Sequence, residues 1–334
     1  MRFSFTDDQL AFSDAVRDLL AKQCPPEVVR DAWESETGRL PALWSQLAEM
    51  GVVGLLVPEG AGGMGLSDVD LVRILSEAGH AGLTEPLSDV AAVAVPTIRD
   101  HADPDVASDL LGRVAAGEAT VGLGLASDGS VLHAASADAF LLEADDGLHL
   151  VESSAVELNP LDSIDGSRRL ARVLWTPTSL TLLPGGAATA QDARDRAAVA
   201  AAAELCGLGD RMMEITVDYV VERKQFGVPI GSFQAVKHHL ANALLALEFA
   251  KPLVWRAAYS QTVGDPQAPV HASMAKAQAS DAAEAVGAAA LQCHGAIGYT
   301  VECDLHLFLK RAWALARRAG DSAHHRRRVG AAVL

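Results

Sequence analysis

One stretch of the sequence combines a cation, an amide and an aromatic ring at the end of a long alanine-rich segment. Residues 222–230 read Glu-Arg-Lys-Gln-Phe-Gly-Val-Pro-Ile, and Phe233 and Gln234 follow. An arginine held at a helix end can bind a phosphate group through two parallel hydrogen bonds. The same arginine can instead only stabilise the negative end of the helix dipole. The pattern alone favours this structural interpretation, with phosphate binding by Arg223 as the alternative.

A second candidate interrupts another long helical segment near the C-terminus. Its residues are Gln292, Cys293, His294, Gly295 and Ala296. Glycine lets a backbone approach a ligand closely, and Gln292 and His294 would lie at the rim of such a site. The alternative is a left-handed helix cap followed by a turn, which the pattern alone favours. Cys293 and His294 have no further ligands at helical spacing, so they predict no metal site and Cys293 reads as a small buried residue.

The remaining charged groups have simpler interpretations. The carboxylates at Asp103 to Asp109 and Asp192 to Asp195 are expected on exposed helix starts, as caps. The basic tail from Arg311 to Arg328 is expected to be a solvated face or a partner surface. Its adjacent histidines, His324 and His325, point to different faces of a helix and make a poor chelating pair. The sequence contains no dinucleotide-binding glycine fingerprint, Walker loop or serine nucleophile elbow.

Composition limits the class of protein. The 334 residues carry a net charge of −16, which argues against general nucleic-acid or anionic-membrane binding but permits an anionic small ligand in a local basic pocket. The four cysteines form no C-x-x-C pair and fit a reducing compartment. The N-terminal stretch is acidic and amphipathic, unlike a signal peptide, and the apolar runs are too short to span a bilayer. We therefore expect a cytoplasmic protein.

The elements that must position these residues form three regions, and they predict an α+β fold that is mainly α. Residues 1–115 read as helices, with a Thr6 cap completed by Gln9, an extended apolar piece at 52–58 and a glycine-rich loop at 59–65. Residues 116–188 read as a small, mostly antiparallel β domain, and residues 189–334 as a helical bundle. The expected strands are 119–125, 139–142, 148–151, 170–175 and 180–183, with a hairpin turn at 145–147, and the expected long helices are 190–222, 235–263, 268–292 and 304–319.

Taken together, these segments resemble the acyl-CoA dehydrogenase family over nearly the whole chain. The most specific piece is residues 223–227 with Pro229-Ile230 and Phe233-Gln234. The resemblance implies an N-terminal helical domain, a central β domain and a C-terminal four-helix bundle, in agreement with the three regions. Further matching pieces are Phe5–Gln9, Leu47–Gly54, Val57–Gly65, Met274–Lys276 and Gly295–Glu302.

The resemblance also implies a cofactor and partners. The family binds FAD at a subunit interface and removes hydrogen from the α and β carbons of an acyl-CoA thioester. The implied partners are that thioester, an electron-transfer flavoprotein or similar acceptor, and a homologous subunit or a second copy, in a dimer or tetramer. By resemblance Arg223, Gln225 and Phe226 contact the pyrophosphate and adenosine of a neighbouring subunit's FAD, Gln234 belongs to the same region, and Gln292, Cys293, His294, Gly295 and Ala296 cradle the diphosphate from the other side.

The sequence departs from the family at the catalytic base. The two known positions of the family's catalytic glutamate correspond here to Ala319 and Ala197. After residues 126–130, the section that would pack on the flavin ring is also missing. Three hypotheses follow: a base-lacking subunit that works with a catalytic homologue, an active homo-oligomer with a displaced base, and a scaffold that binds no flavin. For the displaced base the candidates are Asp321, nearest to the lost position, Asp195 and Glu204.

Overall fold

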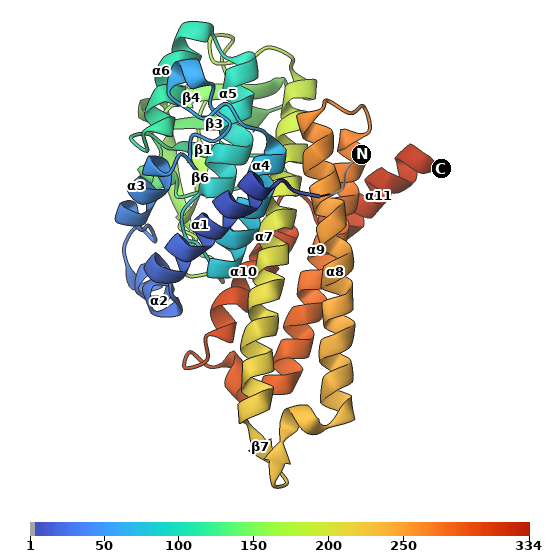
Figure 1. Ribbon diagram of the computed structural model, residues 1–334. Helices are drawn as coiled ribbons and strands as arrows, with labels where there is room; N and C mark the ends of the chain where they lie inside the picture. The colour runs from blue at the N-terminus through green and yellow to red at the C-terminus, as the bar shows by residue number, and fades with distance from the viewer. Residues whose placement is uncertain (1–3) are drawn as a thin grey trace.

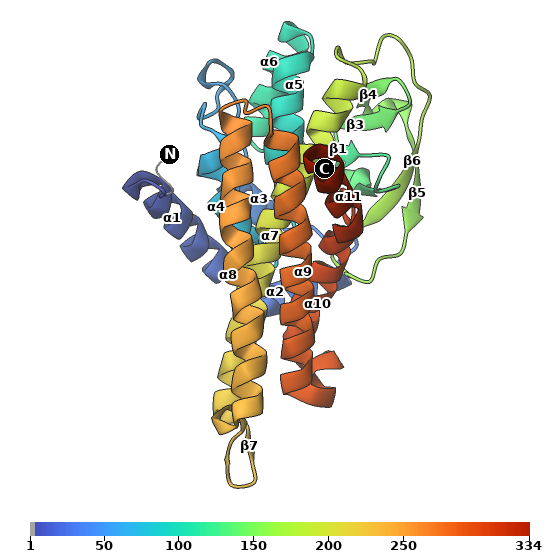
Figure 2. The same cartoon turned by 90° about the vertical axis from the view of Figure 1, so that its right-hand side faces the viewer.

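The computed structural model describes residues 4–334, and it is built around one long central helix, α7 (Ala187–Glu222) (Figure 1). On one side α7 packs against helices from the first third of the chain. On the other side it packs against the three helices that complete a C-terminal bundle. The small β sheets lie beside the upper end of α7 (Figure 2). The fold is α+β and mainly α, as the sequence predicted.

The first third of the chain is helical and begins as expected. Thr6 caps the first helix, and Gln9 completes the capping box by accepting a hydrogen bond from the Thr6 backbone N–H. A π-helical stretch, η2 (Ser88–Ala94), runs directly into the next helix. The helices are α1 (Asp7–Gln23), α2 (Pro26–Glu34), α3 (Pro41–Glu49), α4 (Asp68–Ala81), α5 (Val95–His101) and α6 (Pro104–Ala115).

The extended piece expected at residues 52–58 is wrong over residues 52–57. These residues form consecutive turns, in which Val57 N donates to Gly54 O at 3.1 Å. Five of the six side chains are apolar and buried, and Gly54 sits where an added Cβ would lie 2.7 Å from Ala115 Cβ. A short apolar run buried on all sides does not distinguish a strand from tightly packed turns.

Two three-stranded sheets make up the β region. One has the order β1-β3-β4 and the other β2-β6-β5. All pairings are antiparallel except β1 with β3, and a turn at Asp145 and Asp146 joins β3 to β4, which confirms the expected hairpin. The strand expected at 180–183 is wrong, because these residues make only a single bridge, between Leu182 and His149. The strands are β1 (Val121–Gly124), β2 (Val131–Leu132), β3 (Ala139–Ala144), β4 (Gly147–Glu152), β5 (Glu157–Leu161) and β6 (Leu170–Leu174).

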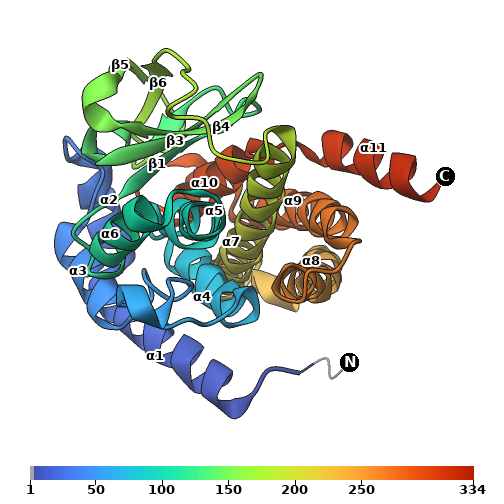
Figure 3. The same cartoon turned by 90° about the horizontal axis from the view of Figure 1, so that it is seen from above.

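The C-terminal region is a four-helix bundle with an additional terminal helix. The bundle consists of α7, α8 (Gln234–Thr262), α9 (Ala268–His294) and α10 (Leu305–Arg317). Seen from above, the last helix, α11 (Ser322–Val333), points away from the body (Figure 3). Small residues allow close packing of α7 on α4: a Cβ added to Gly207 would lie 1.8 Å from Ser76 O. In residues 4–334 no helix is both long and apolar enough to cross a bilayer.

Candidate functional site

The first predicted group of site residues lies on a hairpin that projects from the end of α7 (Figure 1). Its two short strands are β7 (Lys224–Gln225) and β8 (Val228–Pro229). The hairpin is closed at its base by a hydrogen bond from Ile230 N to Arg223 O at 2.8 Å. Arg223 and Gln225 are exposed, and within residues 4–334 no carboxylate forms an ion pair with Arg223.

Phe226 at the tip of the hairpin is strained and uncovered. Its φ is +54°, in the left-handed region that a bulky residue rarely adopts, and the residue is 94% exposed. Its ring meets the ring of Phe233 edge to face, with centroids 6.2 Å apart. Because an exposed aromatic ring gains most by stacking or by insertion into another surface, this geometry suits contact with a planar ligand or a second subunit.

The second predicted group lies at the end of α9, next to the end of α7. His294 is buried, and its ring stacks on Tyr219 of α7 with centroids 4.3 Å apart and an interplanar angle of 18°. Its Nδ1 donates to Ala290 O at 2.9 Å. Burial lowers the His294 pKa, so the ring is neutral at neutral pH. Gly295 ends the helix with φ +66°, and a Cβ there would meet nothing within 4 Å.

A shallow pocket of about 400 Å³ between α8 and α9 contains one of the predicted residues. Gln292 and Asn242 supply amides at its rim, and its walls include four alanines. Cys293 is half-buried rather than fully buried as expected, and burial raises its pKa. The lining residues are His239, Asn242, Ala243, Ala285, Ala288, Ala289 and Gln292.

These features fit the phosphate and nucleoside part of FAD. An exposed guanidinium suits a diphosphate, an exposed ring suits an adenine, and small residues allow close approach of a ligand. Gln234 begins α8 and is exposed, directly after the hairpin. The structure therefore places both predicted groups at the same end of the bundle, although they are about 70 residues apart in the sequence.

Neither expected base position carries a proton acceptor in its side chain. Ala197 is buried within α7, and Ala319 lies in the short turn between α10 and α11. The turn is firmly held: Lys276 is fully buried and donates from Nζ to Ala316 O and Gly320 O, at 3.0 and 3.1 Å. His325 Nε2 donates to Ala319 O at 3.0 Å.

The three candidates for a displaced base differ in their surroundings. Asp321 caps α11 by accepting from His324 N at 2.7 Å, and this hydrogen bond lowers its pKa. Asp195 was expected as an exposed cap, but it is buried inside α7 and paired with Arg328 at 2.6 Å. Glu204 lies about two turns beyond Ala197 on the same helix, and burial raises its pKa.

The expected solvated basic tail is only partly correct. The Arg311 side chain is almost entirely buried and pairs with Asp165. Its guanidinium also donates a hydrogen bond to Leu83 O at 2.6 Å. The Arg318 side chain is 8% exposed and pairs with Asp89, whose own side chain is 3% exposed. Burial raises the pKa of Asp89. The sequence pattern could not predict these ion pairs, because each carboxylate is far from its arginine along the chain.

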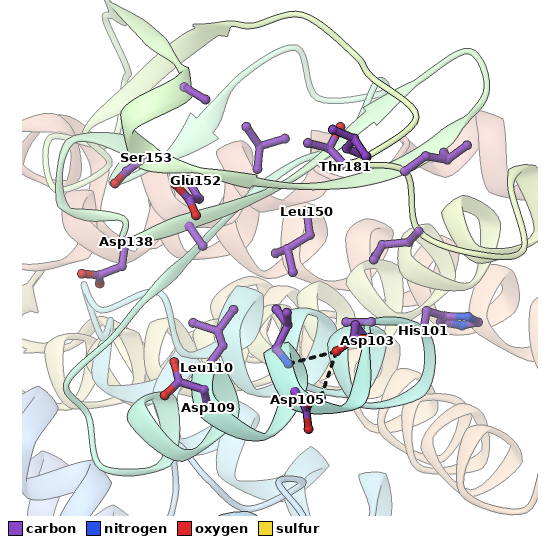
Figure 4. A pocket seen from close by; sticks show the side chains of 18 of the residues that line it. His101, Asp103, Asp105, Asp109, Leu110, Asp138, Leu150, Glu152, Ser153 and Thr181 are labelled. Carbon is purple, nitrogen blue, oxygen red and sulfur yellow. Dashed lines mark hydrogen bonds between the residues drawn. The ribbon is translucent and has the colours of Figure 1, made fainter.

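The largest described groove, of about 1310 Å³, lies elsewhere (Figure 4). It runs between α6 on one side and the end of β4 with residues 180–184 on the other. Asp103 lies at its edge and accepts from Asp105 N and Val106 N, which confirms it as the cap of α6. Aspartates dominate its polar lining, and none of the predicted site residues lines it, so it is a poor site for the phosphates of FAD or coenzyme A.

Comparison with known proteins agrees with this architecture. Residues 6–118 match the model of the acyl-CoA dehydrogenase N-terminal domain, and residues 185–334 match that of the acyl-CoA dehydrogenase C-terminal domain. The chain is 33% identical over 335 residues to acyl-CoA dehydrogenase IpdE2 of Mycolicibacterium smegmatis, which covers 98% of this chain and 100% of that protein.

Solved structures show the same fold. The ChsE4–ChsE5 complex from Mycobacterium tuberculosis superposes with a TM-score of 0.90 at 21% identity, covering 99% of this chain and 98% of that chain. PigA, solved with FAD and proline, gives a TM-score of 0.86 at 19% identity over 100% and 99% of the two chains. The protein defined by this fold and these matches belongs to the acyl-CoA dehydrogenase family.

Proposed function

We propose that this chain is an FAD-holding subunit of an acyl-CoA dehydrogenase that lacks its own catalytic base. The exposed hairpin at Arg223–Phe226 carries the proposal, since it presents an unpaired cation and an uncovered ring beyond the body of the chain. A group that projects in this way is suited to a cofactor seated in a neighbouring subunit. Arg223 would bind the diphosphate, and Gln225 and Phe226 the adenosine, with Gln234 beside them.

The end of α9 is the second contributor to the proposed cofactor site. Gln292, Cys293, His294, Gly295 and Ala296 would approach the diphosphate from the side opposite the hairpin. The neutral His294, fixed by Ala290 O and by the Tyr219 ring, keeps the helix end in place. Gly295 leaves room for the ligand because no side chain or backbone atom fills its Cβ position.

In this proposal the base belongs to a homologous partner chain. FAD, when bound, accepts the hydride from the β carbon of the acyl-CoA thioester, and a carboxylate removes the α proton. Ala319 and Ala197 supply no such carboxylate here. The proposal of a partner chain is supported by the ChsE4–ChsE5 complex, one chain of which shares this fold. The electrons would leave through an electron-transfer flavoprotein or a similar acceptor.

The surface of α8 supports assembly into a dimer or tetramer. Leu244, Leu245 and Phe249 are 42%, 56% and 66% exposed, and they lie within two turns of the same helix. Leu245 and Phe249 are four positions apart and so share one face of the helix, and large apolar side chains exposed together are typical of a subunit interface. We propose that α8 packs against another subunit, either a homologue or a second copy.

One observation favours a second candidate, an active homo-oligomer with a displaced base. Glu204 lies on the helix that carries Ala197, and burial raises its pKa above the ordinary value, as is common for carboxyl groups at functional sites. Its carboxylate is close to the hydroxyl of Ser88 and to Arg311 and Arg318, which favour the ionised form. Loss of turnover by Glu204→Gln in the isolated chain would select this candidate.

Flavin content tests the proposed function. The chain, purified with any homologue that accompanies it, is compared with Arg223→Ala by visible absorbance and by release of FAD on dilution. Loss of a charge-assisted hydrogen bond of about 1.5–3 kcal/mol predicts about tenfold to hundredfold weaker binding. Arg327→Ala is the matched control, because Arg327 is exposed on α11 at the far end from the hairpin. Unchanged flavin in Arg223→Ala, or no flavin in the wild type, would contradict the proposal.

A further inference from the structure

The large groove between α6 and the β region has an apolar floor. Leu110 on α6 and Leu150 on β4 point toward one another across it (Figure 4). Leu183 adds a third apolar side chain to the lining. The volume of about 1310 Å³ exceeds the about 300–1,000 Å³ that is typical of small-molecule sites. The groove is therefore large enough to hold a segment of polypeptide.

Apolar side chains are also exposed on both walls of this groove. Val106 on α6 is 50% exposed, and Leu180 on the opposite wall is 95% exposed. Single exposed apolar side chains are common on protein surfaces, but these two flank an apolar floor. An apolar surface that is surrounded by polar residues is typical of a protein interaction site. The groove has the composition of a surface that a second molecule covers.

The charge at the rim of the groove is negative. Asp105 and Asp109 lie on α6, Glu152 lies at the end of β4, and all three are exposed (Figure 4). Within residues 4–334 none of these three carboxylates forms an ion pair with a lysine or an arginine. By contrast, Asp138 is balanced by Arg113, whose Nη2 lies 3.8 Å from Asp138 Oδ1. Unpaired carboxylates around a groove attract a cationic ligand and repel an acidic or phosphorylated one.

We propose that this groove binds a cationic amphipathic segment of a partner protein. Its apolar side chains lie on the floor, and its lysines or arginines face Asp105, Asp109 and Glu152. Charge complementarity selects this occupant, because an acidic segment is repelled by the rim and a purely polar one leaves the floor uncovered. The 12 residues of α6 span about 18 Å, which matches an extended segment of about six residues. This proposal is independent of the proposed cofactor site and of the α8 surface.

Peptide binding tests the proposal on the whole chain. The probe is a fluorescently labelled peptide of about eight residues in which leucine and lysine alternate, long enough to span the groove when extended. Its control has glutamate in place of each lysine. We expect the lysine peptide to bind at least about tenfold more tightly in fluorescence anisotropy, and its affinity to fall as ionic strength rises. Equal binding of the two peptides would overturn the proposal.

Charge variants separate the groove from the general negative charge of the protein. Asp105→Asn with Asp109→Asn removes two rim charges and should weaken binding of the lysine peptide about fivefold to tenfold. The matched control is Asp7→Asn with Asp8→Asn, which changes the net charge equally at the exposed first turn of α1. This control should leave the affinity unchanged. Equal weakening by both pairs would show attraction to the overall charge and would contradict a site in the groove.

One further variant tests the apolar contact and the identity of the occupant. Leu180→Ser should weaken peptide binding about threefold to tenfold, and it removes a side chain that is exposed in the folded chain. Val263→Ser, at a 52% exposed position directly after α8, is the control and should bind like the wild type. Unchanged affinity in Leu180→Ser would overturn the proposal. Dissociation of the protein's own assembly by Leu180→Ser, seen in sedimentation, would assign the groove to a second copy instead. Flavin content reports separately on Arg223.

Discussion

Tyr219 stacks on His294 with ring centroids 4.3 Å apart, and this contact joins the end of α7 to the end of α9. The hairpin after α7 and the glycine turn after α9 are thereby held at one end of the bundle. Each segment by itself reads as an ordinary helix ending. Together they present a cation, amides, an exposed ring and open space around Gly295, and on these features the proposed FAD site depends.

Two substitutions of Phe226 should separate the contribution of its ring to FAD binding from the effect of its left-handed backbone conformation on stability. Phe226→Ala and Phe226→Gly both remove the ring, so both should weaken FAD retention by about tenfold. Glycine adopts a φ of +54° without cost, whereas alanine pays a steric penalty there, so the glycine variant should be about 1 kcal/mol more stable than the alanine variant. Equal stability of the two, measured by urea unfolding, would show that the left-handed conformation is absent in solution.

The buried pair of Arg318 and Asp89 should be costly to break from one side. Asp89→Asn leaves the buried Arg318 guanidinium without its paired carboxylate, which predicts a loss of up to about 3–5 kcal/mol in the free energy of unfolding. The double variant Asp89→Asn with Arg318→Met removes both charges and should recover part of this loss. If Asp89→Asn were as stable as the wild type, the pair would be exposed to solvent rather than buried.

Lys276 should make stability depend on pH. Burial lowers its pKa to about 7, so between pH 7 and the pKa of the unfolded chain the unfolded state binds more protons than the folded one. Stability should therefore increase as pH rises from 7, by about 2 kcal/mol up to pH 9 from this residue alone. Lys276→Met should lose that increase in urea unfolding at the two pH values, whereas Lys237→Met, an exposed lysine on α8, should keep it.

Charge placed on the exposed apolar face of α8 should dissociate the assembly. Phe249→Glu puts a carboxylate into the proposed interface, where burial without a partner is strongly unfavourable. Sedimentation should show smaller species than in the wild type. Val106→Glu, at a half-exposed position on α6, is the control and should leave the oligomeric state unchanged. An unaltered assembly in Phe249→Glu would exclude this face.

Features that depend on neighbouring residues could be predicted from the sequence. The Thr6 cap, the two-residue hairpin before Gly147 and the helix end at Gly295 all follow from side chains within four positions. The three-region order was predictable for the same reason, because helical and strand periodicities are local. The residues proposed for FAD came from the resemblance of these motifs to the acyl-CoA dehydrogenase family, and not from the residue pattern alone.

Long-range pairings could not be predicted in this way. Arg311 pairs with Asp165 across 146 residues. The sequence therefore predicted a solvated basic tail, although part of this tail is buried. Asp195 looked like an exposed cap because its partner, Arg328, is 133 residues away. The contact of Asp128 with the backbone N–H of Ala319 is of the same kind, because it joins residues 191 positions apart.

The most direct test of the account is turnover by the isolated chain. We expect little or no acyl-CoA dehydrogenation with an artificial electron acceptor, because loss of a positioned base typically costs about 10²–10⁴-fold. Addition of the homologous subunit should restore turnover, and Arg223→Ala in this chain should then reduce it through loss of FAD. Ala319→Glu should give the isolated, flavin-supplemented chain measurable activity. Full turnover by the wild-type chain alone would contradict the claim that it is a base-lacking subunit.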